Sequence, residues 1–145
     1  MILKIKRETP EIDIPEYESL GASGFDLKAH LGNSIFVEPR DLAIVPTGLS
    51  FEVPSGYEMQ IRSRSGLAIK HSVMVLNSPG TIDSDYRGEV KVILINLGHS
   101  TFRVRPGARI AQGVIAAVQQ VDLLEIQEDL TETIRGSQGF GSTGV

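Results

Sequence analysis

Short apolar runs, separated by turn residues, dominate the hydrophobic pattern of this chain. Most runs alternate apolar and polar positions or form compact apolar clusters, and both patterns are typical of β-strands. The runs cover residues 2–6, 25–29, 35–37, 42–45, 57–61, 73–76, 89–96, 101–104, 109–118 and 121–126. About ten short strands, punctuated by turns such as Pro54-Ser55-Gly56, predict an all-β barrel or jelly roll.

One segment, Ser65 to His71, predicts a short helix instead. Leu67, Ala68 and Ile69 tolerate helix, and Ser65 is placed to cap it. The chain has no internal repeat of fixed period, which argues against a propeller or a solenoid.

The composition changes towards the C-terminus. Residues 125–132 are acidic, and residues 135–145 are rich in Gly, Ser and Thr. We therefore expect two parts: a β-barrel domain over residues 1–130, and a mobile arm over residues 131–145 that closes over an active site.

Overall composition narrows the function. A chain of 145 residues that is 41% hydrophobic fits one domain with one ordinary core. A net charge of -4 argues against direct nucleic-acid binding, which needs a basic face. Without cysteine there are no disulfides, thiolate zinc sites or cysteine nucleophiles. No apolar run approaches the roughly 20 residues that span a membrane, and no signal-peptide apolar region follows the basic N-terminus, so we expect a cytoplasmic protein.

The turn-rich segment of residues 77–88 carries the first candidate chemistry. Its Ile-Asp-Ser-Asp sequence has an ordinary interpretation as a pair of Asx turns. Asp83, however, follows Ile82 and precedes Tyr86 by three residues. A carboxylate beside apolar and aromatic surface is partly desolvated, which would make Asp83 a better general base for a bound water.

The predicted helix start offers a phosphate site. Arg64, Ser65 and Gly66 combine a guanidinium, a hydroxyl and a residue that permits close backbone approach. The alternative is a capped surface helix with solvated arginines. Asp26 could contact magnesium through water or sit in an ordinary turn, and Gln112 could cap a neighbouring backbone group.

The C-terminal tail can be interpreted as a disordered end or as a lid. As a lid, Phe140 would stack on a base, while Arg135, Ser142 and Thr143 would reach phosphate oxygens. The glycines would permit the folding over.

Taken in chain order, five segments resemble the five sequence motifs of the homotrimeric dUTPase family. The segments are residues 24–27, 62–68, 77–88, 109–112 and 135–144, spread over nearly the whole chain. Five matches in the right order are far more specific than any one alone. The resemblance implies a distorted β-barrel or jelly roll with one short helix and a flexible C-terminal arm.

The resemblance also implies a dUTP diphosphatase. Such an enzyme hydrolyses dUTP to dUMP and pyrophosphate, which limits uracil incorporation into DNA and supplies dUMP for dTMP synthesis. Asp83 would activate the water that attacks the α-phosphorus. The implied uracil- and sugar-binding residues are Asn77, Gly80, Thr81, Ile82, Tyr86 and Lys91. Tyr86 would pack against deoxyribose and so reject UTP.

By the same resemblance, the phosphates would be held by Arg64, Ser65, Gly66 and Gln112. Asp26 would position Mg²⁺ indirectly, through its water shell. The arm would contribute Arg135, Phe140, Gly141, Ser142 and Thr143. The family forms homotrimers with shared active sites, in which the tail of one chain closes over a neighbour's dUTP.

The chain departs from the family pattern at Ser23, Ser63, Gly113 and Gln138. Gln138 matters most, because its side chain could limit how the arm folds. Two alternatives remain: a dCTP deaminase or bifunctional deaminase-dUTPase, and a module that binds dUTP without turnover. The short chain and the absence of a convincing acid/base glutamate argue against the first, and Asp83 argues against the second.

Overall fold

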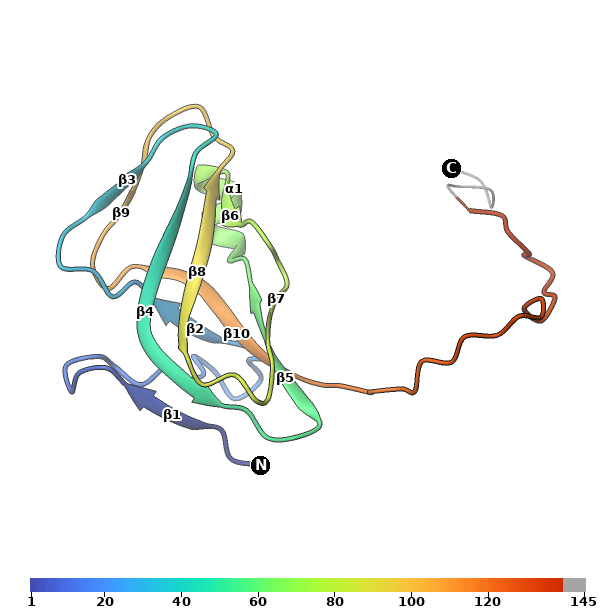
Figure 1. Cartoon of the computed structure of the whole chain (residues 1–145). Helices are drawn as coiled ribbons and strands as arrows, with labels where there is room; N and C mark the ends of the chain where they lie inside the picture. The colour runs from blue at the N-terminus through green and yellow to red at the C-terminus, as the bar shows by residue number, and fades with distance from the viewer. Residues whose placement is uncertain (140–145) are drawn as a thin grey trace.

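Two four-stranded antiparallel sheets and a two-stranded sheet enclose the core (Figure 1). The structure, a computed structural model, describes residues 1–139. The first sheet has the order β1-β4-β8-β6 and the second the order β2-β10-β5-β7. The strands are β1 (Lys4–Arg7), β2 (Phe25–Lys28), β3 (Ile35–Val37), β4 (Leu42–Glu52), β5 (Tyr57–Arg62), β6 (Val73–Val75), β7 (Gly80–Ile82), β8 (Glu89–Asn96), β9 (Phe102–Val104) and β10 (Arg109–Ala117). The all-β prediction is confirmed.

The predicted helix is present, but its predicted cap is wrong. Helix α1 (Ser65–His71) begins after Arg64, which occupies the N-cap position without a side-chain cap hydrogen bond. The Arg64 carbonyl accepts the amides of Leu67 and Ala68 at 3.1 Å each, so Ser65 already lies inside the first turn.

Strand β4 is longer than the apolar pattern predicted. It continues past residue 45 to Glu52 through a register shift between Pro46 and Ser50. Gly48 supplies the bend with a φ of 65°, a left-handed conformation that glycine adopts without strain. The sequence pattern ended the strand early because the bend interrupts the alternation.

Two further differences concern strand pairing. The short strand β7 lies in the segment expected to be loop, and it pairs with β5 through Met59 and Ile82. The strand expected over residues 121–126 is wrong. The described residues after Ala117 form no strand, and Leu123 there is 94% exposed. Among residues 1–139 no strand pairs with them, and Figure 1 shows the segment leaving the barrel.

The core is built from the inward side chains of both sheets. Phe25 of β2 stacks on Phe51 of β4 at 6.1 Å between ring centroids, which joins the sheets directly. Gly113 makes room for this ring, because a Cβ there would lie 2.7 Å from Phe25 Cε2 and 3.1 Å from Met59 Sδ. Gly113, a departure from the family pattern, is therefore matched to the packing of Phe25. Within residues 1–139 no helix has the length and apolar character needed to cross a membrane.

A buried amide organises one end of the barrel. Asn96 is 0% exposed, and its Nδ2 donates to the carbonyls of Val37 and Ser100, each at 2.9 Å. Its Oδ1 accepts the amide of Gly98 at 2.9 Å. One side chain thus satisfies three backbone groups from two separate segments, and buried backbone groups without partners are costly.

Replacing Asn96 by Leu should lower the free energy of unfolding by about 3 kcal/mol, because it leaves those three backbone groups unpaired. Thermal unfolding at fixed protein concentration measures the loss. Ser100→Ala is the matched control, since Ser100 contributes only its carbonyl and should leave the melting temperature nearly unchanged. An Asn96→Leu protein that melts with the wild type would contradict this interpretation.

Candidate active site

Residues from the turn-rich segment line one pocket beside the start of β8. The pocket has a volume of about 390 Å³, and its wall includes Ile44, Thr81, Ile82, Asp83, Tyr86, Glu89, Val90, Lys91 and Ile93. Five residues that the sequence proposed for base, sugar or catalysis therefore meet here: Thr81, Ile82, Asp83, Tyr86 and Lys91. We call this the Asp83 pocket.

Asp83 begins the tight turn that returns the chain to β8. The Tyr86 amide donates to the Asp83 carbonyl at 3.2 Å, and Arg87 Nη1 donates to the Ser84 carbonyl at 2.7 Å. The Asp83 side chain is exposed in the single chain. The partial desolvation expected from Ile82 and Tyr86 is therefore not present in one chain, since these neighbours flank the carboxylate without covering it.

The amide expected to read uracil lies at the other end of the same hairpin. Gly80 is buried, and a Cβ at Gly80 would lie 3.1 Å from Asn77 Nδ2. The Asn77 side chain therefore packs over the Gly80 backbone. This arrangement holds an amide donor and acceptor beside the strand that leads into the Asp83 pocket.

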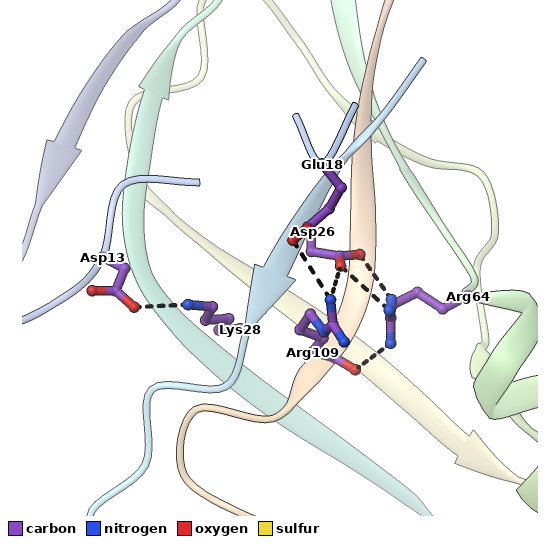
Figure 2. Close-up of polar contacts among 6 residues, drawn as sticks. All are labelled: Asp13, Glu18, Asp26, Lys28, Arg64 and Arg109. Carbon is purple, nitrogen blue, oxygen red and sulfur yellow. Dashed lines mark hydrogen bonds and ion pairs between the residues drawn. The ribbon is translucent and has the colours of Figure 1, made fainter. Parts of the chain in front are cut away.

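A second group of predicted residues gathers around Asp26 on β2 (Figure 2). Arg64 Nε lies 2.8 Å from Asp26 Oδ1, and its Nη2 lies 3.3 Å from Oδ2. Arg109 Nη1 is 3.3 Å from Asp26 Oδ2 and 3.5 Å from Glu18 Oε1. Both arginines are thereby held at the start of α1, where phosphate binding was predicted.

Gln112 joins this second group from β10. It lies opposite Asp26 on one side and Arg62 on the other, and its Nε2 donates to the Ser63 carbonyl at 3.0 Å. The amides of Ser65 and Gly66 belong to the first helical turn, where N–H groups have no partner within the helix. We refer to Asp26, Arg64, Ser65, Gly66 and Gln112 as the Arg64 group.

A separate ion pair lies on the far side of β2, as Figure 2 also shows. Lys28 Nζ is 2.7 Å from Asp13 Oδ2. The hydrogen bond from Lys28, together with its charge, lowers the pKa of Asp13. Both side chains are well exposed, so the pair is a surface feature that links the N-terminal segment to β2.

The register of β5 separates the two groups within one chain. Arg62 at one end of β5 pairs with Gln112 of the Arg64 group, while Met59 pairs with Ile82 next to Asp83. Three residues of strand cover about 10 Å. Accordingly, among the described residues the wall of the Asp83 pocket includes no member of the Arg64 group.

An apolar sheet face borders the Asp83 pocket. Outward-facing Leu42 and Ile44 of β4 are 49% and 60% exposed, and they pair with Ile95 and Ile93 of β8. Ile44 and Ile93 also line the pocket. A sheet whose second face is apolar rather than alternating with polar residues is typical of a surface that another layer covers.

Sequence reasoning missed two residues of these groups. Arg109 was noted only as part of a motif, yet it shares Asp26 with Arg64. Glu89 lines the Asp83 pocket, where its Oε1 accepts the Gly48 amide at 2.9 Å and its Oε2 lies 3.5 Å from Lys91 Nζ. The alternation of β8 places Glu89 and Lys91 on one face, and this was the available signal.

The arm residues are only partly described. Arg135 Nε donates to the Gln138 carbonyl at 3.0 Å, a local contact away from both groups. Phe140, Gly141, Ser142 and Thr143 lie outside the described residues. Their roles stay predictions.

The fold is similar to those of known proteins. The fold is similar to a Staphylococcus bacteriophage 80alpha dUTPase with dUpNHpp, with a TM-score of 0.89, 24% identity, and 99% of each chain covered. It is also similar to a dUTPase variant from phage phi11 of S. aureus, with a TM-score of 0.79, 20% identity, and 88% of this chain and 98% of that one covered. At these identities the structures establish the fold alone.

Sequence relatives establish more. The deoxyuridine 5'-triphosphate nucleotidohydrolase of Chlamydia muridarum is 58% identical over 131 residues, which cover 90% of each chain. The corresponding protein of Chlamydia pneumoniae is 56% identical over 133 residues, 92% of each chain. The family model described as dUTPase matches residues 10–144. The chain therefore belongs to the dUTPase family and is a hydrolase that converts dUTP to dUMP and pyrophosphate.

Proposed function

We propose that this dUTP hydrolase uses Asp83 as the general base at a site shared between copies of the chain. The observation that carries the proposal is the Asp83 pocket, where a carboxylate, an aromatic ring and a lysine face one space. Asp83 would take a proton from a water molecule as that water attacks the α-phosphorus. The bond from the α-phosphorus to the bridging oxygen then breaks, and pyrophosphate leaves.

The nucleoside would enter along the hairpin of residues 77–83. Asn77 and the backbone of Gly80 to Ile82 offer donors and acceptors for the uracil edge, and a base pocket formed there would exclude thymine by leaving no room for its methyl group. Tyr86 would pack its ring on deoxyribose and leave no room for a 2′-hydroxyl. Lys91 would lie at the floor of the site, near the sugar.

The phosphates of dUTP would bind to the Arg64 group. Asp26 holds the Arg64 guanidinium in a fixed orientation, and a fixed fork of N–H donors suits phosphate oxygens. The first-turn amides of Ser65 and Gly66 and the side chain of Gln112 would complete the cradle. Positioning and charge neutralisation of this kind supply most of the rate in phosphoryl transfer.

The donor set fits Mg²⁺ only through water. Within residues 1–139 no three His, Asp or Glu side chains cluster as metal ligands. A carboxylate accepts about four hydrogen bonds, and Asp26 already accepts three from Arg64 and Arg109. One position remains for a water of a hydrated Mg²⁺ ion carried by the triphosphate. Bound there, the ion would neutralise phosphate charge, and Asp26 would orient its water shell. A phage phi11 dUTPase has a structural Mg(II) ion, which supports a role for this metal in the fold.

Three observations support a site shared between chains, in a homotrimer as the family resemblance implies. The register of β5 keeps Asp83 about 10 Å or more from the Arg64 group of the same chain. The exposed apolar face of β4 and β8 borders the Asp83 pocket. The segment after Ala117 leaves its own barrel with apolar side chains exposed, so it is free to reach a neighbour. A second chain would also cover Asp83 and supply the missing desolvation.

The family match favours simple hydrolysis over deamination. A deaminase needs a free glutamate that acts as general acid and base, at the end of the pocket that holds the nucleobase. Glu89, the glutamate of the Asp83 pocket, is engaged by the Gly48 amide and Lys91.

Replacing Asp83 by Asn should lower the rate of pyrophosphate release by about 10²–10⁴-fold, because the general base is lost while the shape is kept. Affinity for dUTP, measured by calorimetry, should change little. Asp85→Asn is the matched control: it changes a carboxylate of the same turn that does not line the Asp83 pocket, although both carboxylates line a second hollow beside Tyr57. Normal pyrophosphate release from Asp83→Asn would refute the proposed base.

Two inactive variants should restore each other if sites are shared. Asp83→Asn lacks the base and Arg64→Ala lacks the phosphate fork. Co-assembled in equal amounts, they should regain about a quarter of wild-type activity, since one site in four draws both intact residues from different chains. The same variants assembled separately and then mixed are the control. A co-assembled mixture that stays inactive would mean that each site lies within one chain.

Deleting residues 135–145 should cut turnover severely but spare assembly. The arm is expected to close over the bound nucleotide and to exclude water. Steady-state kinetics measures the first effect and light scattering the second. Kinetics equal to those of the full chain would remove the lid from the account.

A further inference from the structure

The ring of Tyr86 rests on the backbone of Gly88. A Cβ built on Gly88 would lie 2.6 Å from Tyr86 Cζ and 3.1 Å from Cε2, and closer still to the hydroxyl oxygen. Ordinary van der Waals contacts of a Cβ begin near 3.4 Å. Any side chain at position 88 would therefore displace the ring by roughly 1 Å.

Backbone conformation does not explain the glycine at this position. The φ of Gly88 lies outside the left-handed region, so an L-residue could adopt the same backbone. The absent side chain is what the ring requires. Gly32, in contrast, has open space around its Cβ position and the same freedom from positive φ.

A hydrogen bond fixes the same hydroxyl-bearing end of the ring that contacts Gly88. Tyr86 Oη donates to the Glu89 carbonyl at 3.1 Å. Glu89 is itself anchored, because its Oε1 accepts the amide of Gly48 at 2.9 Å in the bend of β4. The position of the ring is thus tied to the barrel frame rather than to the turn alone, although the side chain is 44% exposed.

We propose that Gly88 is a positioning residue for sugar selectivity, which it sets by letting the hydroxyl end of the Tyr86 ring lie against the backbone just before β8, at the wall of the Asp83 pocket. The inference rests on the proposed role of Tyr86 against deoxyribose. A wall excludes a 2′-hydroxyl only if its position is fixed to within a fraction of an ångström. With a methyl group at position 88, the ring loses its bond to Glu89 and swings towards solvent, which opens space beside the sugar.

The test is Gly88→Ala, compared with Gly32→Ala as the matched control. Gly88→Ala should lower the preference for dUTP over UTP, measured as the ratio of kcat/KM values, by about tenfold. The loss should appear mainly as a raised KM for dUTP. The kcat at saturation should stay within about threefold of wild type, because Asp83 and the Arg64 group are unchanged. Gly32→Ala should match wild type. A Gly88→Ala enzyme with unchanged preference and KM would overturn the inference.

A double-mutant cycle shows whether the effect acts through the ring. In a Tyr86→Ala background, Gly88→Ala should cause no further loss of preference. A further tenfold loss in that background would overturn the inference, because the methyl group would then act elsewhere. If Tyr86→Ala alone left the preference unchanged, the proposed sugar wall itself would fail, which is a different result from a silent Gly88→Ala.

Tyr86→Phe provides an independent variant should Gly88→Ala assemble poorly by light scattering. It keeps the ring and removes only the bond to the Glu89 carbonyl. The preference for dUTP should fall by about fivefold, the factor expected for one hydrogen bond. A preference equal to that of wild type would contradict the claim that this hydrogen bond must hold the ring against Gly88.

Discussion

The pairing of β5 with β10 on one side and β7 on the other is the constraint on which the site depends. This register places Gln112 beside Arg62 and Ile82 beside Met59, so one rigid strand sets the spacing of the two groups. Side chains on paired strands cannot slide without moving a whole hydrophobic face out of the core. Asp83 and the Arg64 group are therefore held apart in each chain, and we propose that another chain covers the apolar face of β4 and β8 to complete the site.

The same frame explains why several glycines and polar residues have specific positions. Gly113 is matched to the ring of Phe25, Gly48 allows β4 to bend, and Gly88 gives room to Tyr86. Glu89 connects the last two, because it binds the Gly48 amide with its side chain and the Tyr86 hydroxyl with its carbonyl. The proposed sugar selectivity of the Asp83 pocket is thus linked to the bend of β4, which is distant in sequence.

Much of this architecture could be predicted from the sequence, for physical reasons. The alternation of β8 and the turn residues around it gave that strand its bounds, and α1 was placed by helix-tolerant residues. The bend at Gly48 and the pairing of β7 with β5 could not be predicted, because both depend on contacts distant in sequence. The apolar run of residues 121–126 predicted a strand, but a strand requires a partner, and the part of the chain that the structure describes pairs none with it. The local sequence motifs predicted most residues of the Asp83 pocket and the Arg64 group. Arg109 and Glu89 could not be assigned to them from the motifs alone, because their contacts depend on how the strands pair.

We propose that Asp83 of one chain acts on a nucleotide whose phosphates are held by Arg64 of another. A crystal structure with Mg²⁺ and a non-hydrolysable dUTP analogue tests it most directly. We predict a water between the Asp83 carboxylate and the α-phosphorus, in line with the leaving oxygen, and a phosphate contact from the Arg64 side chain of a neighbouring chain. An Asp83 side chain turned away from the α-phosphorus, with no space for water between them, would contradict it.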